Sequence, residues 1–97
     1  MTIQEIKELL EAHRDALRDE LGVEGLYVFG SVARGASSSS SDVDVIVDLD
    51  GDADFDRFME LRERLESLLG APVDLVTRKA IRPALRSSIE QESIRVA

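Results

Sequence analysis

Three short runs of strand-forming residues, separated by longer stretches with helical periodicity, are the feature that most limits what this 97-residue chain can fold into. The runs are 26–29, 42–49 and 73–76; Gly30 ends the first, Asp50 follows the second and Pro72 precedes the third. A few strands that alternate with helices cannot make an all-β sandwich or a helical bundle. The pattern predicts an α/β (α+β) fold with a small mixed sheet flanked by helices.

The stretches around these runs carry apolar residues every three to four positions, which predicts amphipathic helices. Thr2 stands three residues before Glu5, at capping-box spacing, so a helix is predicted over 3–21 and is closed by Gly22. His13, the chain's one histidine, is expected on this helix and exposed.

A second long helix is predicted over 55–70, and Asp52 or Asp54 is expected to cap its start. Pro83 suits the first turn of a last helix, because the N–H that proline lacks has no partner there. The residues that follow at helical spacing are Ala84, Leu85, Ile89 and Glu92. Residues 94–96 are expected to form a small edge strand.

Length and charge restrict the class of protein. The length allows one small domain, residues 1–97. The formal charge of -8, from 12 Lys and Arg against 20 Asp and Glu, argues against binding to nucleic acid, whose phosphates need clustered cations. The absence of cysteine excludes disulfides and thiolate metal sites. Without a long apolar run or a signal-like start, the chain is expected in the cytoplasm and away from membranes.

A Gly30-Ser31 pair follows the first predicted strand. Glycine lets the backbone approach a ligand closely, and a helical turn over 31–34 would offer N–H groups that suit a phosphate. The Ser31 hydroxyl adds a donor, and Arg34 either reaches a phosphate or only decorates the loop. Taken alone, such a pair is usually a plain turn.

Asp42 and Asp44 are spaced so that both carboxylates project to the same side of a strand. Two like charges about 4 Å apart repel by about 4 kcal/mol at an effective dielectric of 20, so a cation or solvent must offset them. A hard divalent ion is the obvious candidate, because Mg²⁺ takes one or two carboxylates together with substrate phosphates. The plain alternative is a solvated pair on an edge strand.

Asp74 is an acid inside an otherwise apolar strand run. If that strand neighbours the Asp42 strand, three carboxylates meet beside a phosphate-binding turn. Such a set describes a two-metal phosphoryl-transfer site in which two Mg²⁺ ions hold a triphosphate. Asp74 would be the ligand or base nearest the incoming hydroxyl.

These residues carry a resemblance. Gly30-Ser31, ten intervening residues and then Asp42-x-Asp44 resemble the signature of the DNA polymerase β-type nucleotidyltransferase superfamily. More closely, 30–35 and 41–47 are similar to the minimal nucleotidyltransferases, or MNT proteins, which include MntA-like antitoxins encoded beside HEPN toxins. The leading helix, the Asp74 strand and the Pro83 helix also resemble that layout, so the resemblance covers almost the whole chain.

The resemblance implies that the chain takes ATP with Mg²⁺ and transfers AMP to a hydroxyl, expected to be a tyrosine, of a partner HEPN toxin. It assigns triphosphate binding to Gly30 and Ser31, and metal binding to Asp42, Asp44 and Asp74. The one visible departure is the serine tract 37–41, which predicts a mobile surface loop and questions acceptor fit more than chemistry.

Other functions fit the sequence less well, and one alternative remains. The acidic stretch 48–56 fails the EF-hand pattern, which needs glycine at its sixth place and glutamate at its twelfth. Polymerase or antibiotic-modifying activity would need further domains to hold template or substrate. The remaining alternative is an antitoxin of the same fold that neutralises its partner by binding, without catalysis.

Overall fold

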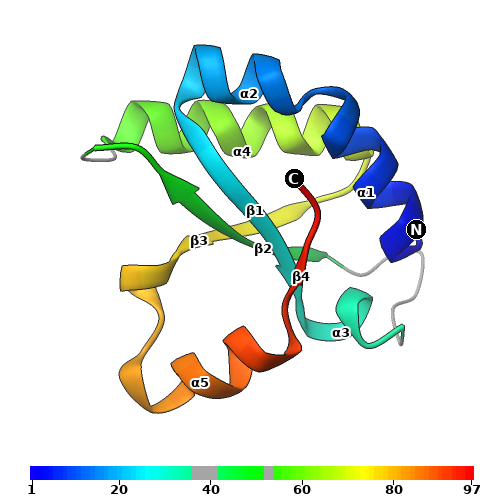
Figure 1. Ribbon diagram of the computed structural model, residues 1–97, viewed down its shortest axis with the longest axis vertical. Helices are drawn as coiled ribbons and strands as arrows, with labels where there is room; N and C mark the ends of the chain where they lie inside the picture. The colour runs from blue at the N-terminus through cyan, green and yellow to red at the C-terminus, as the bar shows by residue number, and fades with distance from the viewer. Residues whose placement is uncertain (36–41, 52–53) are drawn as a thin grey trace.

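The computed structural model describes residues 1–35, 42–51 and 54–97 and contains one four-stranded sheet in the order β3-β2-β1-β4 (Figure 1). β1 pairs antiparallel with both β2 and β4, whereas β2 pairs parallel with β3. The strands are β1 (Val23–Phe29), β2 (Val43–Leu49), β3 (Val73–Thr77) and β4 (Ile94–Arg95). This arrangement confirms the predicted mixed sheet flanked by helices. The predicted serine loop lies outside the described residues.

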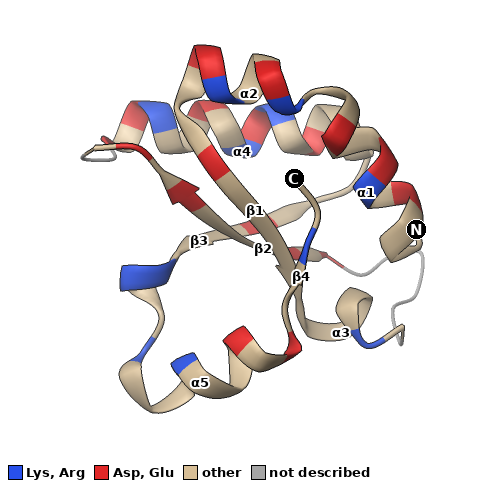
Figure 2. Ribbon diagram, in the orientation of Figure 1, with Lys and Arg blue, Asp and Glu red and all other residues tan. Residues whose placement is uncertain are grey.

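Helices lie on both sides of the strands. α1, α2 and α4 pack together as one layer, and α5 lies on the other side (Figure 1). The helical segments are α1 (Ile3–Ala12), α2 (Arg14–Leu21), α3 (Gly30–Ala33), α4 (Phe55–Leu69), α5 (Pro83–Glu92) and a short 3₁₀ turn η1 (Arg78–Ala80). The η1 turn was not predicted. The long helices α1, α2 and α4 carry both charge signs on their ribbons (Figure 2).

The single helix predicted over 3–21 is wrong in one respect, because it divides at His13 into α1 and α2. The His13 N–H bonds to the Leu10 carbonyl, three residues back, instead of continuing the regular pattern. Leu10 and Leu17 are buried on either side of this point, but His13 and Arg14 between them are exposed. No apolar contact therefore holds the helix to the core where it bends.

The other helix ends follow the sequence closely. The Asp54 side chain accepts a hydrogen bond of 2.7 Å from the Arg57 N–H and caps α4, and the Thr2–Glu5 capping box is formed at the start of α1. Pro83 occupies the first turn of α5. These local signals depend only on neighbouring residues, which is why the sequence predicts them.

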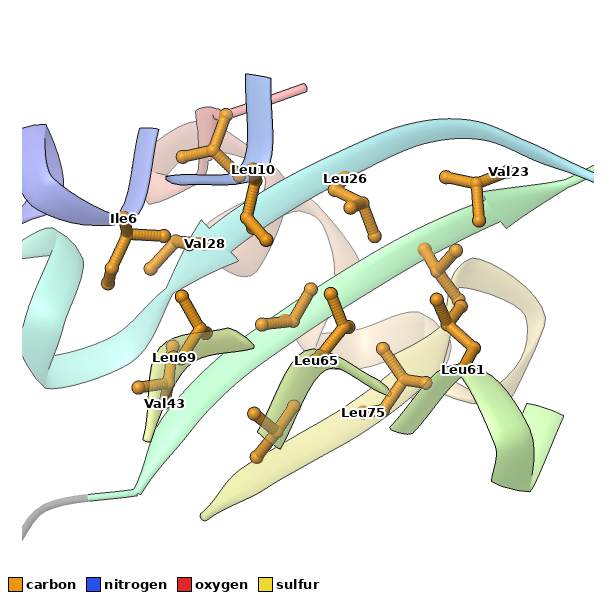
Figure 3. Packing of buried hydrophobic residues seen from close by; sticks show 14 of the residues in the cluster. Ile6, Leu10, Val23, Leu26, Val28, Val43, Leu61, Leu65, Leu69 and Leu75 are labelled. Atoms are coloured by element: carbon orange, nitrogen blue, oxygen red, sulfur yellow. The ribbon is translucent and has the colours of Figure 1, made fainter. Parts of the chain in front are cut away.

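The hydrophobic core lies between the sheet and the layer of α1, α2 and α4 (Figure 3). Alternate residues of β2 face it: Val43, Val45 and Val47 are at most 1% exposed. Ile6 and Leu65 meet them from the helical layer and are fully buried. The intervening residues of β2 therefore face the opposite side of the sheet, toward α5.

The outer edge of β3 is covered at its first residue. The Val73 N–H donates to the Glu66 carboxylate at 2.9 Å, and the Val73 carbonyl accepts from Arg62 Nε at 3.3 Å. Both side chains come from α4, so the backbone groups that point away from β2 at this position are already paired.

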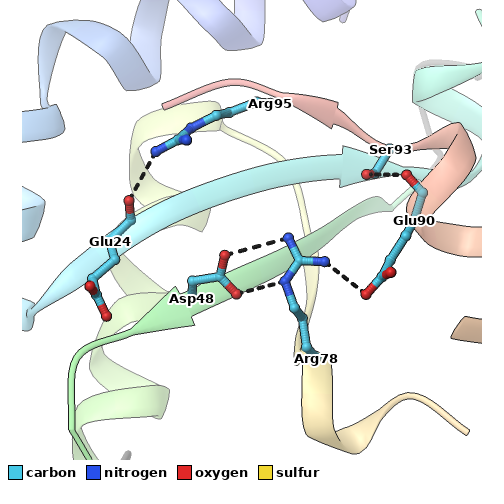
Figure 4. Close-up of polar contacts among 6 residues, drawn as sticks. All are labelled: Glu24, Asp48, Arg78, Glu90, Ser93 and Arg95. Carbon is cyan, nitrogen blue, oxygen red and sulfur yellow. Dashed lines mark hydrogen bonds and ion pairs between the residues drawn. The ribbon is translucent and has the colours of Figure 1, made fainter. Parts of the chain in front are cut away.

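α5 is attached differently from the other long helices, since none of its residues is buried and Leu85 is 52% exposed. Arg78 of η1 connects it to the sheet: its guanidinium contacts Asp48 at 2.9 Å and Glu90 at 2.9 Å (Figure 4). The same guanidinium lies 4.6 Å from the centre of the Tyr27 ring. Polar contacts therefore help to hold the helix over this side of the sheet, where Ile46 of β2 is also fully buried. No helix in the described part of the chain is long and apolar enough to cross a bilayer.

Candidate active site

Asp44 and Asp74 lie side by side on neighbouring strands. β2 and β3 run parallel in a register that places Asp44 opposite Asp74, and β1 places Phe29 opposite Asp44 on the other side. Each acid stands between residues that are buried against the helical layer, so both carboxylates face the α5 side of the sheet. The predicted neighbourhood of these two acids is present.

The surroundings of Asp44 raise the pKa of its carboxyl above the usual 3.8. Partial burial is the largest cause, followed by the negative charges of Asp74 and Asp42, and Asp44 also shares a hydrogen bond with Asp74. The positive charge of Arg34 acts in the opposite direction. The protein alone therefore does not neutralise this cluster, and a bound cation would relieve the repulsion.

Asp42 is exposed and immediately precedes β2. Its charge acts on Asp44, which places it at the same end of the strand. Among the residues that the structure describes, no three His, Cys, Asp or Glu side chains converge closely enough to hold a metal ion. Asp44 and Asp74 thus form a close pair with Asp42 beside it.

Gly30 lies directly against this pair. Its φ of +74° is in the left-handed region, and a Cβ there would stand 3.1 Å from Asp44 Cγ and closer still to the carboxylate oxygen Oδ2. Any side chain at this position would therefore strain the backbone and displace Asp44. Ser31 follows in α3 and is half-buried. The turn predicted at the end of the first strand is brought to the carboxylates as expected.

Arg34 ends α3 and forms an ion pair with Glu92, the last residue of α5, at 3.3 Å. Glu92 also accepts a hydrogen bond of 3.1 Å from the Gly30 N–H. Glu92 was not among the predicted site residues. The available signal was an acid at a helical position that otherwise continues the apolar spacing of Leu85 and Ile89.

The donor set fits Mg²⁺ when the ion is shared with a ligand. The acids supply only oxygen donors, and their mutual repulsion favours a divalent cation. Mg²⁺ needs one or two protein carboxylates when phosphates and water complete its coordination, so a close pair with a third acid nearby suffices. The arrangement suits a phosphate-bearing substrate better than a cage made by the protein alone.

A cleft of about 980 Å³ lies elsewhere, at the opposite end of β2 and β3. It is lined by Asp48, Thr77, Phe55 and Phe58 among others, and Phe55 is 75% exposed. None of the predicted site residues lines it. The carboxylate pair and the Gly30 turn instead combine two close acids, a glycine that leaves no room for a side chain and the nearby charge of Arg34, and they remain the better candidate for chemistry.

Comparison with known proteins identifies a family whose sequence model matches this chain. The nucleotidyltransferase domain family model matches residues 10–96. A Methanocaldococcus jannaschii protein that bears a protein adenylyltransferase name is 42% identical over 98 residues and covers 98% of each chain. Protein adenylyltransferase MntA of Thermococcus cleftensis is 38% identical over 96 residues and covers 99% of this chain and 97% of its own.

Solved structures agree with the relatives. A structure described as a minimal nucleotidyltransferase superimposes with a TM-score of 0.75 at 35% identity and covers 97% of this chain and 95% of its own. A toxin–antitoxin structure with AMP-PNP superimposes with a TM-score of 0.72 at 26% identity and covers all of this chain and 73% of the other. The solved structures and the sequence relatives thus agree on the same family.

Proposed function

The chain belongs to the nucleotidyltransferase domain family, and from that premise we propose that it transfers AMP from ATP, with Mg²⁺, to a hydroxyl of a partner protein. The partner is a HEPN-type toxin, the acceptor hydroxyl is that of a tyrosine, and residues 1–97 act as one minimal domain in the cytoplasm. The modification silences the toxin, so this chain is the antitoxin of the pair. The names of the relatives and the toxin–antitoxin likeness support this proposal.

The observation that carries the proposal is the Asp44–Asp74 pair packed beside Gly30. Neighbouring parallel strands set two acids in register, and a glycine that tolerates no side chain lies against one of them. A structural role alone does not require a repelling acid pair and, against it, a glycine position that leaves no room for a side chain. Nucleotidyl transfer requires both, because phosphate must approach the backbone next to metal-binding carboxylates.

Each residue has a role in this proposal. Gly30, Ser31 and Arg34 bind the triphosphate, and Asp42, Asp44 and Asp74 hold the Mg²⁺, of which two ions are expected. When bound, Mg²⁺ supplies positive charge that offsets the phosphates and the leaving pyrophosphate. The position of Asp44 beside Asp74 and against Gly30 supports these assignments.

The transfer itself is a substitution at the α-phosphorus of ATP. The acceptor oxygen forms a bond to that phosphorus, the bond to the bridging oxygen breaks, and pyrophosphate leaves with the electron pair. The hydroxyl proton passes to a base, for which Asp74 is suited because it is exposed and adjoins Asp44.

The test incubates the chain with a candidate HEPN-type partner protein, ATP and Mg²⁺. We expect transfer of AMP label to a toxin tyrosine, and loss of both the label and the neutralisation in the Asp42→Asn/Asp44→Asn variant. Asp19→Asn is the matched control, because Asp19 is an exposed acid on α2 that forms an ion pair with the adjacent Arg18. If the double variant still neutralises the toxin fully and no AMP moves in the unchanged protein, the chain acts by binding alone.

A further inference from the structure

Glu92 contacts two groups of the Gly30 turn although it lies about sixty residues later in the chain. Its Oε1 accepts from the Gly30 N–H at 3.1 Å, and its carboxylate contacts Arg34 Nη1 at 3.3 and 3.4 Å. One carboxylate thus fixes both the peptide plane of Gly30 and the guanidinium of Arg34.

These contacts are not needed to bury α5, because that helix has no buried residue. A second polar contact, between Glu90 and Arg78 at 2.9 Å, already connects the same end of α5 to the sheet (Figure 4). Glu92 therefore adds little to the core and instead contacts the Gly30 turn, from which it is separated by β2, α4, β3 and η1.

Arg34 in particular needs such a partner. Its side chain is 57% exposed, so packing does not restrict its rotamers, and its five donors point in fixed directions only when an acceptor holds them. Both recorded contacts to Glu92 use Nη1. The charge of Arg34 also acts on Asp44, so Glu92 contacts a cation whose charge reaches the carboxylate pair.

We propose that Glu92 is a positioning residue for nucleotide binding: it holds the Gly30 amide and the Arg34 guanidinium in the arrangement that receives the triphosphate. This inference rests on the proposed function. Gly30 is then fixed from two sides, by Asp44 against its Cα and by Glu92 on its N–H. The end of α5 thereby becomes part of the nucleotide site without touching the reacting atoms.

The test compares Glu92→Ala and Glu92→Gln with Glu90→Ala, which removes one ion pair from the same end of the same helix. ATP affinity in the presence of Mg²⁺ is measured by calorimetry, and AMP transfer to the toxin gives KM and kcat separately. Glu92→Ala is expected to weaken ATP binding about tenfold, the usual effect of losing one charge-assisted hydrogen bond. KM should rise accordingly while kcat changes less, because Glu92 does not contact the reacting atoms.

The ATP affinity of Glu92→Gln is expected to lie between those of the unchanged protein and Glu92→Ala. Its amide oxygen can still accept from the Gly30 N–H but no longer attracts Arg34 by charge. Glu90→Ala should bind ATP within about twofold of the unchanged protein. The inference is overturned if Glu92→Ala binds ATP as tightly as before or more tightly, the latter meaning that Glu92 competes with phosphate. Equal weakening by Glu90→Ala would overturn it too, because the effect would then come from loosening α5.

A measurement without nucleotide separates this inference from the proposed function. If Glu92 holds the turn, hydrogen exchange at the Gly30 amide should accelerate in Glu92→Ala and stay unchanged in Glu90→Ala, whatever the chain binds. Unchanged exchange would overturn the positioning role by itself. Failure of the unchanged protein to bind ATP would instead contradict the proposed function. Thermal melting of the variants shows whether each is folded, and Glu92→Gln, which conserves shape, serves if Glu92→Ala is not.

Discussion

Replacing Gly30 by alanine should do more damage than the same change at another glycine with the same backbone conformation. Gly30 and Gly70 both have positive φ, +74° and +65°, so alanine at either position costs about 1–2 kcal/mol for the left-handed conformation. At Gly70 nothing lies within 4 Å of the added Cβ, whereas at Gly30 the Cβ meets the Asp44 carboxylate. The two variants therefore differ by the clash alone.

The clash is expected to cost about 0.5–1.5 kcal/mol more, because the nearest atoms are the end of the Asp44 side chain, which must rotate away. Gly30→Ala should thus lower the free energy of unfolding by about 1.5–3.5 kcal/mol in total, measured by urea denaturation. Each kcal/mol corresponds to about 4–8 °C in Tm for a domain of this size. A displacement of about 1 Å at a reacting site can cost about a hundredfold in rate, so AMP transfer should fall at least that much in Gly30→Ala and stay near normal in Gly70→Ala.

A double-variant cycle isolates the cause. In an Asp44→Ala background the carboxylate is absent, so Gly30→Ala should cost no more than Gly70→Ala does. Equal destabilisation by the two glycine variants in the unchanged background, with transfer activity retained in Gly30→Ala, would refute the argument that Asp44 lies against Gly30 for a functional reason.

Three further outcomes are expected from the structure. Because the folded state raises the pKa of Asp44, the fold binds more protons than the unfolded chain, and stability falls as pH rises through the interval above 3.8. Asp44→Asn should therefore raise the Tm at pH 7 without divalent cations, by an equivalent of about 1 kcal/mol after allowing for solvent, and this gain should vanish at pH 3; an unchanged Tm at pH 7 would contradict the repulsion. Leu65→Ala, at a fully buried position, should lower the unfolding free energy by about 2–5 kcal/mol in urea, and a loss below about 1 kcal/mol would contradict its place in the core. Asp54→Ala should cost about 0.5–2 kcal/mol through the lost cap of α4, measured by the same denaturation. Asp56→Ala, in the first turn of the same helix, serves as its control.

The sequence predicts those parts of the structure that depend on local spacing. The caps at Thr2 and Asp54 and the turn at Pro83 follow from neighbouring residues. The alternation in β2 places Asp44 on the side opposite the core, as the pattern indicates. The break at His13 did not follow from the spacing, because the apolar stripe continues on both sides of it and the bend is set by how the two halves meet the core.

The sequence predicts most residues of the candidate site but not the contacts between them. Motif spacing identifies Gly30 and Asp44, yet only the strand register shows that Asp74 stands beside Asp44. Glu92 could not be assigned, because its partners lie 58 and 62 residues away and the contact depends on where α5 comes to rest. The spacing of apolar residues predicts that α5 forms, but polar contacts such as that of Glu92 follow no periodic pattern that would show where the helix lies on the sheet.

The hydrogen bonds that Glu66 and Arg62 make with the Val73 backbone affect how easily this protein aggregates at high concentration. An open strand edge is a template on which another copy can add its own strand, and such additions propagate into aggregates. Here a second molecule would first have to displace two ionic side chains that already saturate the hydrogen-bonding capacity of β3 at that residue. The two contacts therefore disfavour the addition of another strand at this point of the β3 edge.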